Sequence, residues 1–148
     1  MKLESLANSL LATEGDAIVA VDSDGLIRLW NPGARRIFGF SEQEALGRTL
    51  DLIVPEAQRR AHHSGFARVM AGGETRYGAG DVLAVPALTR DGRRISVEFT
   101  IVLLRDSAGA TEGMAAIMRE VTARFEETRA LRKKIAALEA RSSSEAGK

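Results

Sequence analysis

The residue best suited to chemistry in this chain is His62, which stands in the segment Pro55-Glu-Ala-Gln-Arg-Arg-Ala-His-His-Ser-Gly-Phe-Ala-Arg-Val-Met70. Phe66, Val69 and Met70 follow it at spacings of four, seven and eight residues, which places all four side chains on one helix face. An imidazole on an apolar face must find a hydrogen-bond partner in the protein or bind a ligand, because an unpartnered buried polar group is costly. The residues alone leave both roles open, a core histidine and a ligand.

The composition excludes several kinds of chemistry. The 148 residues include 21 basic and 20 acidic side chains, so a net charge of +1 gives no field that would recruit nucleic acid or an anionic membrane. The absence of cysteine excludes disulfides, thiolate metal sites and thiol adducts, and it is compatible with a reducing cytoplasm. No apolar run approaches the roughly 20 residues that span a bilayer. We therefore expect a soluble, unprocessed cytoplasmic protein with no membrane or nucleic-acid partner.

Other catalytic or metal arrangements are poorly supported. His62 and His63 make a poor metal pair, because adjacent helix residues diverge by about 100° and the chain has no further histidine. No carboxylate pair or Ser-His-Asp arrangement is visible. The candidate carboxylates stand instead at predicted turns and helix caps: Asp16, Asp22, Asp24 and Asp51. We expect that this chain is not an enzyme.

The first part of the chain predicts a leader helix, a hairpin and two short helices. Residues 1–13 carry leucines at helical spacings, and residues 17–21 and 26–30 are β-prone runs joined by a turn. Asn31-Pro32 has the residue types that begin a helix, and Ser41-Glu-Gln-Glu44 has the spacing of a capping box. A pairing of Glu44 with Arg90 is also expected.

The second part predicts one longer helix and three strands. Pro55 opens a helix that runs to about residue 71 and carries both histidines, and strands are predicted over 82–88, 94–104 and 114–118. The sequence therefore predicts an α+β domain over residues 14–120. Its five-stranded antiparallel sheet should have helices on one face and a pocket between the two layers.

The C-terminal part predicts an amphipathic helix over 121–141. Its apolar side recurs at spacings of three and four, and residues 128–138 fit a short heptad seam. The residues concerned are Val121, Phe125, Thr128, Leu131, Ile135 and Leu138. Such a helix either docks on its own domain or forms a short parallel coiled coil with a second copy, and we favour the coiled coil after Phe125. The polar residues 142–148 are expected to form a disordered tail.

The sequence resembles a PAS sensor domain in three segments, which occur in the family's order. They are Gly25-Leu-Ile-Arg-Leu-Trp-Asn-Pro-Gly-Ala-Arg-Arg-Ile-Phe-Gly-Phe-Ser-Glu-Gln-Glu-Ala-Leu-Gly47, then Arg90-Asp-Gly92, then Met118-Arg-Glu-Val-Thr122. The resemblance covers about residues 5–125, and most PAS domains carry Asp where this chain has Glu120. It implies a PAS fold. Because the family binds haem, flavins, small metabolites or nothing, it does not fix the ligand.

Within that family, the helix of His62 is most similar to the oxygen-sensing haem domain of FixL-type kinases. The matching positions are Pro55, Glu56, His62, Met70, Gly73 and Glu74. The resemblance implies that His62 is the axial ligand of b-type haem, with His63 the poorer match by register. Apolar walls would come from Ile53, Phe66, Val69 and Met70, and the distal side from Leu83, Val97, Phe99, Ile101 and Met118. Arg76 would meet a haem propionate or remain a solvated loop residue.

One departure from the FixL pattern concerns the gas. The arginine that hydrogen-bonds dioxygen in those sensors falls at or next to Val82 and Leu83, both of which are apolar. The resemblance then implies a site that favours CO or NO over O2, or one that takes a second protein ligand.

The expected function is a stand-alone sensor that forms a homodimer, detects a diatomic gas or redox state and signals in trans to a downstream protein. Two alternatives stay open, a cofactor-free dimerisation module and a binder of another small molecule. For the second, a non-covalent flavin could lie near Trp30 and Asn31.

Overall fold

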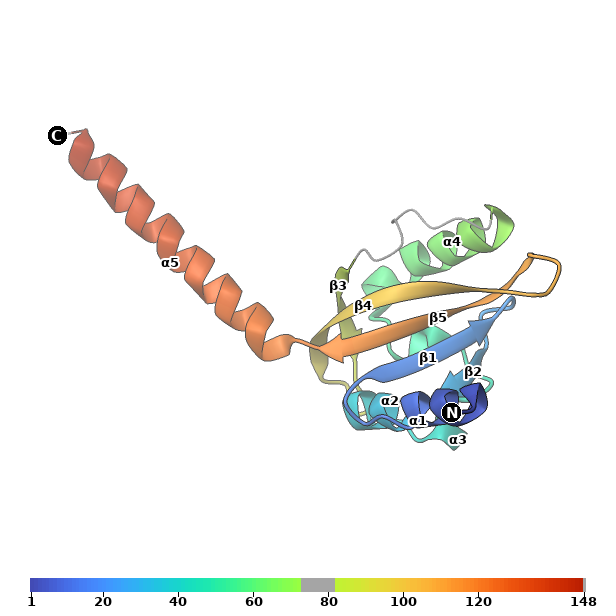
Figure 1. Cartoon of the computed structure of the whole chain (residues 1–148). Coiled ribbons are helices and arrows are strands. Elements are labelled where there is room, and N and C mark those ends of the chain that lie inside the picture. Colours follow the sequence, from blue (N-terminus) through green and yellow to red (C-terminus); the bar gives the residue numbers. More distant parts are fainter. Residues whose placement is uncertain (73–81, 148) are drawn as a thin grey trace.

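The computed structural model describes residues 1–72 and 82–147, which form one sheet with helices around it (Figure 1). The strands are β1 (Ala17–Asp22), β2 (Ile27–Trp30), β3 (Leu83–Leu88), β4 (Arg94–Arg105) and β5 (Thr111–Glu120). The helices are α1 (Leu3–Leu11), α2 (Pro32–Phe38), α3 (Glu42–Ala45), the 3-10 turn η1 (Leu50–Leu52), α4 (Glu56–Gly72) and α5 (Thr122–Ala146). The strand order is β2-β1-β5-β4-β3, and all neighbouring pairs are antiparallel. The predicted α+β architecture is confirmed.

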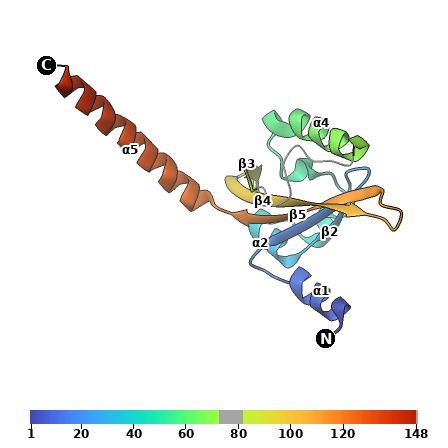
Figure 2. The ribbon, with the colours of Figure 1, turned by 45° about the horizontal axis from the view of Figure 1, so that its top comes forward.

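The inner face of the sheet carries the core. Every second residue of β1 is buried, namely Ala17, Val19 and Val21. These side chains belong to one core cluster with the buried side chains of α2 and of the neighbouring segments. Helices α2, α3 and α4 contact β1, β2 and β5 respectively. In Figure 2, α4 and α1 lie on opposite sides of the sheet. Among the described helices, α2 and α3 bury residues in the core and α4 packs Phe66 against it, whereas α1 lies on the other side of the sheet from α4 and has no buried residue.

Asn31 explains how the hairpin turns into α2. Its Oδ1 accepts hydrogen bonds from the backbone N–H groups of Ala34 at 2.9 Å and Ile18 at 2.7 Å, so one side chain caps α2 and joins it to β1. Pro32 occupies the first helical turn, as predicted. The predicted capping box of Ser41 and Glu44 is also present.

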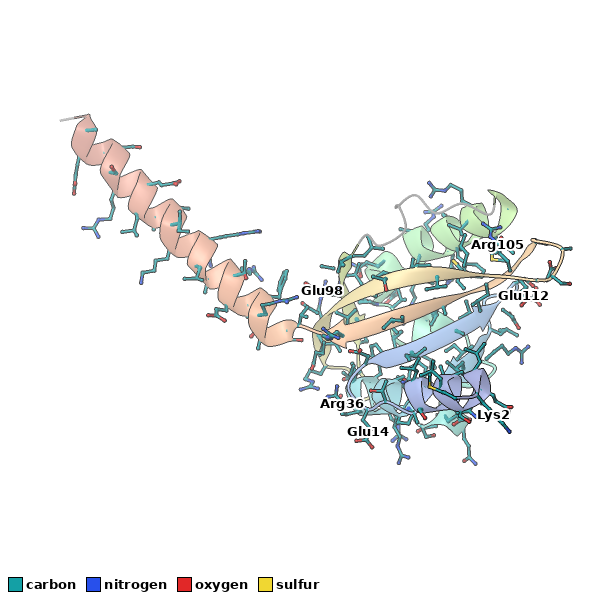
Figure 3. All side chains as sticks on the ribbon, viewed as in Figure 1. Lys2, Glu14, Arg36, Glu98, Arg105 and Glu112 are labelled. Atoms are coloured by element: carbon teal, nitrogen blue, oxygen red, sulfur yellow. The ribbon has the colours of Figure 1, made fainter. Side chains whose placement is uncertain are left out.

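Two long-range contacts secure the helices around the sheet. The Glu44 carboxylate lies 3.0 Å from Arg90 Nε, as expected, which links α3 to the turn between β3 and β4. Arg36 of α2 donates to the carbonyl oxygens of Glu14 at 2.6 Å and Gly15 at 3.1 Å, and Figure 3 shows Arg36 and Glu14 near one another. Both contacts are exposed, so they contribute mainly to orientation.

The end of the chain differs from the prediction. We expected a disordered tail over residues 142–148, but α5 continues through Ala146. Adding a residue to an existing helix is far easier than starting one, and residues 142–146 contain no Gly or Pro to stop it. The strand predicted over 114–118 is also longer, because its flanking residues continue the pairing with β4.

Helix α5 projects away from the sheet (Figures 1 and 2). Its apolar residues are half exposed, with Phe125 at 49%, Leu131 at 53% and Ile135 at 54%. The alternative in which this helix docks on its own domain is therefore wrong for the segment after Phe125. In the described part of the chain, no helix is both long and apolar enough to cross a membrane.

Candidate functional site

The start of α4 is anchored to η1. Arg59 donates from Nε to the carbonyl oxygen of Val54 at 3.0 Å and from Nη2 to that of Asp51 at 3.3 Å. The Nε2 atom of His63 lies 2.7 Å from Oδ1 of Asp51. These contacts join two successive turns of α4 to the preceding loop and thereby fix the rotation of the helix about its axis.

The rotation of α4 turns one face toward the sheet. Gln58, His62, Phe66, Val69 and Met70 lie on that face and are half-buried, whereas the described residues on the opposite face are exposed. Phe66 packs against the core and also reaches the β1–β2 turn. No described residue of α4 is fully buried. The helix therefore covers the core loosely with an apolar face that contains one imidazole.

The predicted distal residues share the inner face of the sheet. Leu83 lies opposite Phe99, and Phe99 lies opposite Met118, so the three side chains form one row across β3, β4 and β5. Val97 and Ile101 flank Phe99 two residues away and point to the same side. Val97 and Met118 are buried at 1% and 5% exposure, and the other three are half-buried. The sheet thus presents an apolar wall on the side that α4 covers.

The remaining predicted residues fall in different places. Ile53 is buried at 6% exposure, and its carbonyl oxygen accepts from Leu88 N–H at 2.8 Å, so it joins η1 to the sheet. Val82 is 62% exposed just before β3, whereas Leu83 begins the strand on the inner face. Arg76 lies outside the described residues, as do Gly73 and Glu74.

His62 occupies an unusual environment for an imidazole. Its Nδ1 atom is buried and has no hydrogen-bond partner among the described residues. Burial lowers the pKa of His62, the neighbouring His63 lowers that pKa further, and the Asp51 carboxylate partly opposes both effects. The ring is therefore neutral near pH 7 and keeps a lone pair on one nitrogen, which is the form that binds metals.

His63 has the opposite surroundings. Its side chain is 58% exposed and already engaged with Asp51, although the two imidazole ring centres are only 6.1 Å apart. Of the two histidines, His62 is the one turned toward the apolar wall.

Trp30 and Asn31 offer nothing to a flavin. Trp30 Nε1 donates to the Phe40 carbonyl oxygen at 2.9 Å. The Asn31 amide accepts two backbone hydrogen bonds and donates to the carbonyl oxygens of Thr13 and Asp16. Since these polar groups are fully used inside the protein, both residues are structural here.

Two grooves on the molecular surface lie away from His62. They lie between β4 and the start of α5, and between α2 and the β3–β4 turn, and neither borders His62. The argument for the site therefore rests on its side-chain chemistry. No cluster of three metal-ligating side chains occurs in residues 1–72 and 82–147.

Gln58 belongs to the same face of α4 and was not singled out from the sequence. The signal that could have pointed to it is its position four residues before His62.

Comparison with known proteins gives both partial and nearly full-length matches. The sensor protein FixL of Bradyrhizobium diazoefficiens is 38% identical over 65 residues, which is 44% of this chain and 13% of that protein. The PAS domain of a Colwellia psychrerythraea protein has a TM-score of 0.69 at 21% identity, covering 82% of this chain and 98% of that structure. An RNA-binding Light-Oxygen-Voltage receptor has a TM-score of 0.72 at 21% identity, over 90% of this chain and 37% of that one.

The matches cover different shares of the chain and of the proteins that it resembles. The chain spans less than a fifth of the length of the curated relatives that it matches. The two structural matches are each 21% identical to this chain, so they show the fold alone. A family model described as the PAS fold matches residues 12–126, which include the sheet and the helices that cover it. The chain therefore belongs to the PAS family, whose members are in general sensory or interaction modules.

Proposed function

We propose that this PAS sensory domain binds b-type haem through His62 and responds to a diatomic gas or to redox state. The observation that carries the proposal is the buried, unpartnered Nδ1 of His62 on the face that α4 turns toward the sheet. A neutral imidazole carries a lone pair on one ring nitrogen, and that lone pair is what ligates haem iron, while the other nitrogen keeps a proton to donate within the protein. The partial similarity to FixL, a sensor protein, supports the same proposal.

The surrounding residues fit the chemistry of a porphyrin. His62 provides the nitrogen ligand, and the half-buried residues Phe66, Val69 and Met70 of α4 provide apolar contacts. Leu83, Phe99 and Ile101 provide a second apolar wall on the sheet. Ile53, Val97 and Met118 lie deeper in the core and would border the site from below. When bound, haem supplies an iron centre that binds diatomic gases and changes oxidation state.

The expected preference among diatomic gases follows from the apolar side chains that the sheet turns toward α4. The side chains of Leu83, Phe99 and Ile101 carry no hydrogen-bond donor, and bound dioxygen is the diatomic ligand that gains most from one. We therefore propose that the site favours CO or NO over O2.

The path to the output begins where β5 ends. Val121 N–H donates to the Ser96 carbonyl oxygen at 2.9 Å, and Thr122 Oγ1 accepts from Ser96 N–H at 3.0 Å. Glu98 of β4, labelled in Figure 3, pairs with Arg124 in the first turn of α5. A shift of β4 under the ligand would thus move the start of α5 and change how it pairs with a second copy. A downstream protein would read that change.

A cofactor-free dimerisation module is the second candidate function. One observation favours it: the apolar side of α5 is half exposed and needs no ligand to pair with a second copy. In that case His62 would be a core residue.

Absorption spectroscopy separates the two functions. We expect the full chain, purified with haem or mixed with it, to show a strong Soret band that shifts on adding CO. His62→Ala should lose the band, and His63→Ala, the matched control one residue away, should keep it. A band that persists in His62→Ala rules out the ligand assignment. Wild-type protein that takes up no added haem favours the dimerisation module.

A further inference from the structure

Two orphaned polar atoms lie one turn apart on α4. Gln58 Oε1 and His62 Nδ1 are both buried, and neither has a hydrogen-bond partner among the described residues. They differ in what they can do: the amide oxygen only accepts, whereas the ring nitrogen donates when it carries the proton. The two atoms are therefore complementary.

The helix geometry brings the two side chains together. Residues four apart on a helix have Cβ atoms about 5–6 Å apart, and helical side chains lean toward the N-terminus, so the His62 ring inclines over Gln58. Neither atom is hydrogen-bonded in the described structure, so a rotation of the flexible Gln58 side chain would have to close the remaining gap. Both side chains are half-buried on the face turned to the sheet, where water competes poorly for either group.

The neighbouring histidine already has a side-chain partner, through its other ring nitrogen and outside the helix. His63 has an acceptor of its own, Asp51 Oδ1, at 2.7 Å from Nε2. Asp51 precedes α4 and is engaged on the exposed side of the helix. Since Asp51 is hydrogen-bonded to His63, an acceptor for the Nδ1–H of His62 would have to come from α4 itself.

We propose that Gln58 is a positioning residue for His62: its Oε1 accepts a hydrogen bond from Nδ1–H and so fixes the ring tautomer. With the proton held on Nδ1, the lone pair stands on Nε2, the ring atom farther from the helix backbone. The tautomer is a property of the protein alone. Its consequence for haem rests on the proposed function, because an acceptor behind a ligating imidazole fixes the ring orientation and raises its basicity.

The tautomer can be measured directly in the full chain without haem. Two-bond proton–nitrogen correlation spectra of protein labelled with ¹⁵N-histidine, recorded at alkaline pH, distinguish Nδ1–H from Nε2–H. We expect wild-type His62 to carry its proton on Nδ1. Gln58→Leu should convert the ring to a mixture or to Nε2–H, and Gln58→Glu, which keeps an acceptor, should retain Nδ1–H. Gln43→Leu, at an exposed site on α3, is the matched control and should change nothing.

Haem titration then tests the consequence. Gln58→Leu should weaken haem binding by about 10- to 100-fold, and Gln58→Glu should restore most of it. A wild-type spectrum with His62 as Nε2–H, or a tautomer unchanged in Gln58→Leu, overturns the inference whether or not haem binds. Wild-type protein without a Soret band removes the proposed function but leaves the tautomer result standing by itself.

Discussion

His62 and His63 show how strongly local geometry acts at the scale of single residues. The two side chains are chemically identical and adjacent, yet one is half-buried over the apolar sheet and the other is exposed beside Asp51. A step of one residue turns a helix by about 100°, so neighbours face different surroundings. The candidate ligand is therefore selected by the rotation of α4, which Arg59 and His63 fix through their contacts with the loop before it.

Asp22 gives a prediction at the same scale. Its Oδ2 accepts from Arg28 Nε at 2.6 Å, and its Oδ1 accepts from the N–H groups of Asp24 and Leu26 at 3.0 Å each. The hydrogen bond from Arg28, followed by that from Leu26, lowers the pKa of Asp22 below its ordinary value of 3.8. Folding favours the charged form, so the stabilisation is complete above that ordinary value and is lost as the pH falls through the lowered pKa.

We therefore expect Asp22→Asn to make the free energy of unfolding less dependent on pH in the acidic range. Urea denaturation from neutral pH to about pH 3 would measure the difference. Asp24→Asn in the same turn is the control and should keep the wild-type slope. Equal slopes for wild type and Asp22→Asn would contradict the assignment.

At the scale of elements, the fit of α2 against β1 depends on a missing side chain. A Cβ atom at Gly33 would lie 1.9 Å from the Asp16 carbonyl oxygen, a backbone atom that cannot move aside by itself. Gly33 N–H also donates to the Thr13 carbonyl oxygen at 3.1 Å. The close approach lets α2 bury Ile37 and Phe38 in the core.

Two glycine-to-alanine changes should therefore have opposite effects. Gly33→Ala should lower the free energy of unfolding by roughly 1–3 kcal/mol, because the backbone must shift to admit a methyl group. Gly65→Ala lies within α4, where the new Cβ would have no atom of the described residues within 4 Å apart from its own stretch of helix, and it should raise stability by about 0.5–1 kcal/mol. Chemical denaturation of the two variants gives both values. A neutral Gly33→Ala would show that α2 is not held as closely as described.

At the scale of the whole molecule, α5 is the helix that projects away from the sheet. Its 25 residues extend about 37 Å from the sheet, and no described residue of the helix is buried. Leu131, Ile135 and Leu138 are each between 53% and 54% exposed and recur at seam spacings. PAS domains commonly dimerise, and we propose that a second copy pairs along this seam.

Replacing Leu131, Ile135 and Leu138 together by alanine should weaken the homodimer by on the order of 100-fold or more in dissociation constant, because each lost side chain removes buried apolar surface. Analytical ultracentrifugation over a range of concentrations would measure it. The control replaces three off-seam residues of the same helix by alanine: Glu126, Arg129 and Lys133. If the seam variant remains as dimeric as wild type, the interface lies elsewhere, with α1 and its exposed leucines the next candidate.

The sequence was a good guide where local chemistry decides. Turn residues, the Asn31 cap and the capping box of Ser41 each act within a few residues, so the order of strands and helices could be predicted from them. The tail over 142–146 could not, because polar composition alone does not say whether an adjacent helix continues. Gln58 was passed over for a similar reason, since a glutamine on a helix face looks ordinary until its amide oxygen is found buried.

The sequence by itself determined an α+β order of elements and brought His62 and the apolar residues of α4 to one helix face, because both follow from short-range periodicity. It pointed to the PAS fold through the resemblance of three segments to that family. Only the tertiary structure decided which surroundings each side chain meets. The strand order β2-β1-β5-β4-β3 places Leu83, Phe99 and Met118 in one row, although they lie far apart in the chain. How far each side chain is buried is a property of packing between distant segments. It decides that the His62 nitrogen is buried without a partner and that the apolar side of α5 is exposed. Local sequence patterns do not contain it.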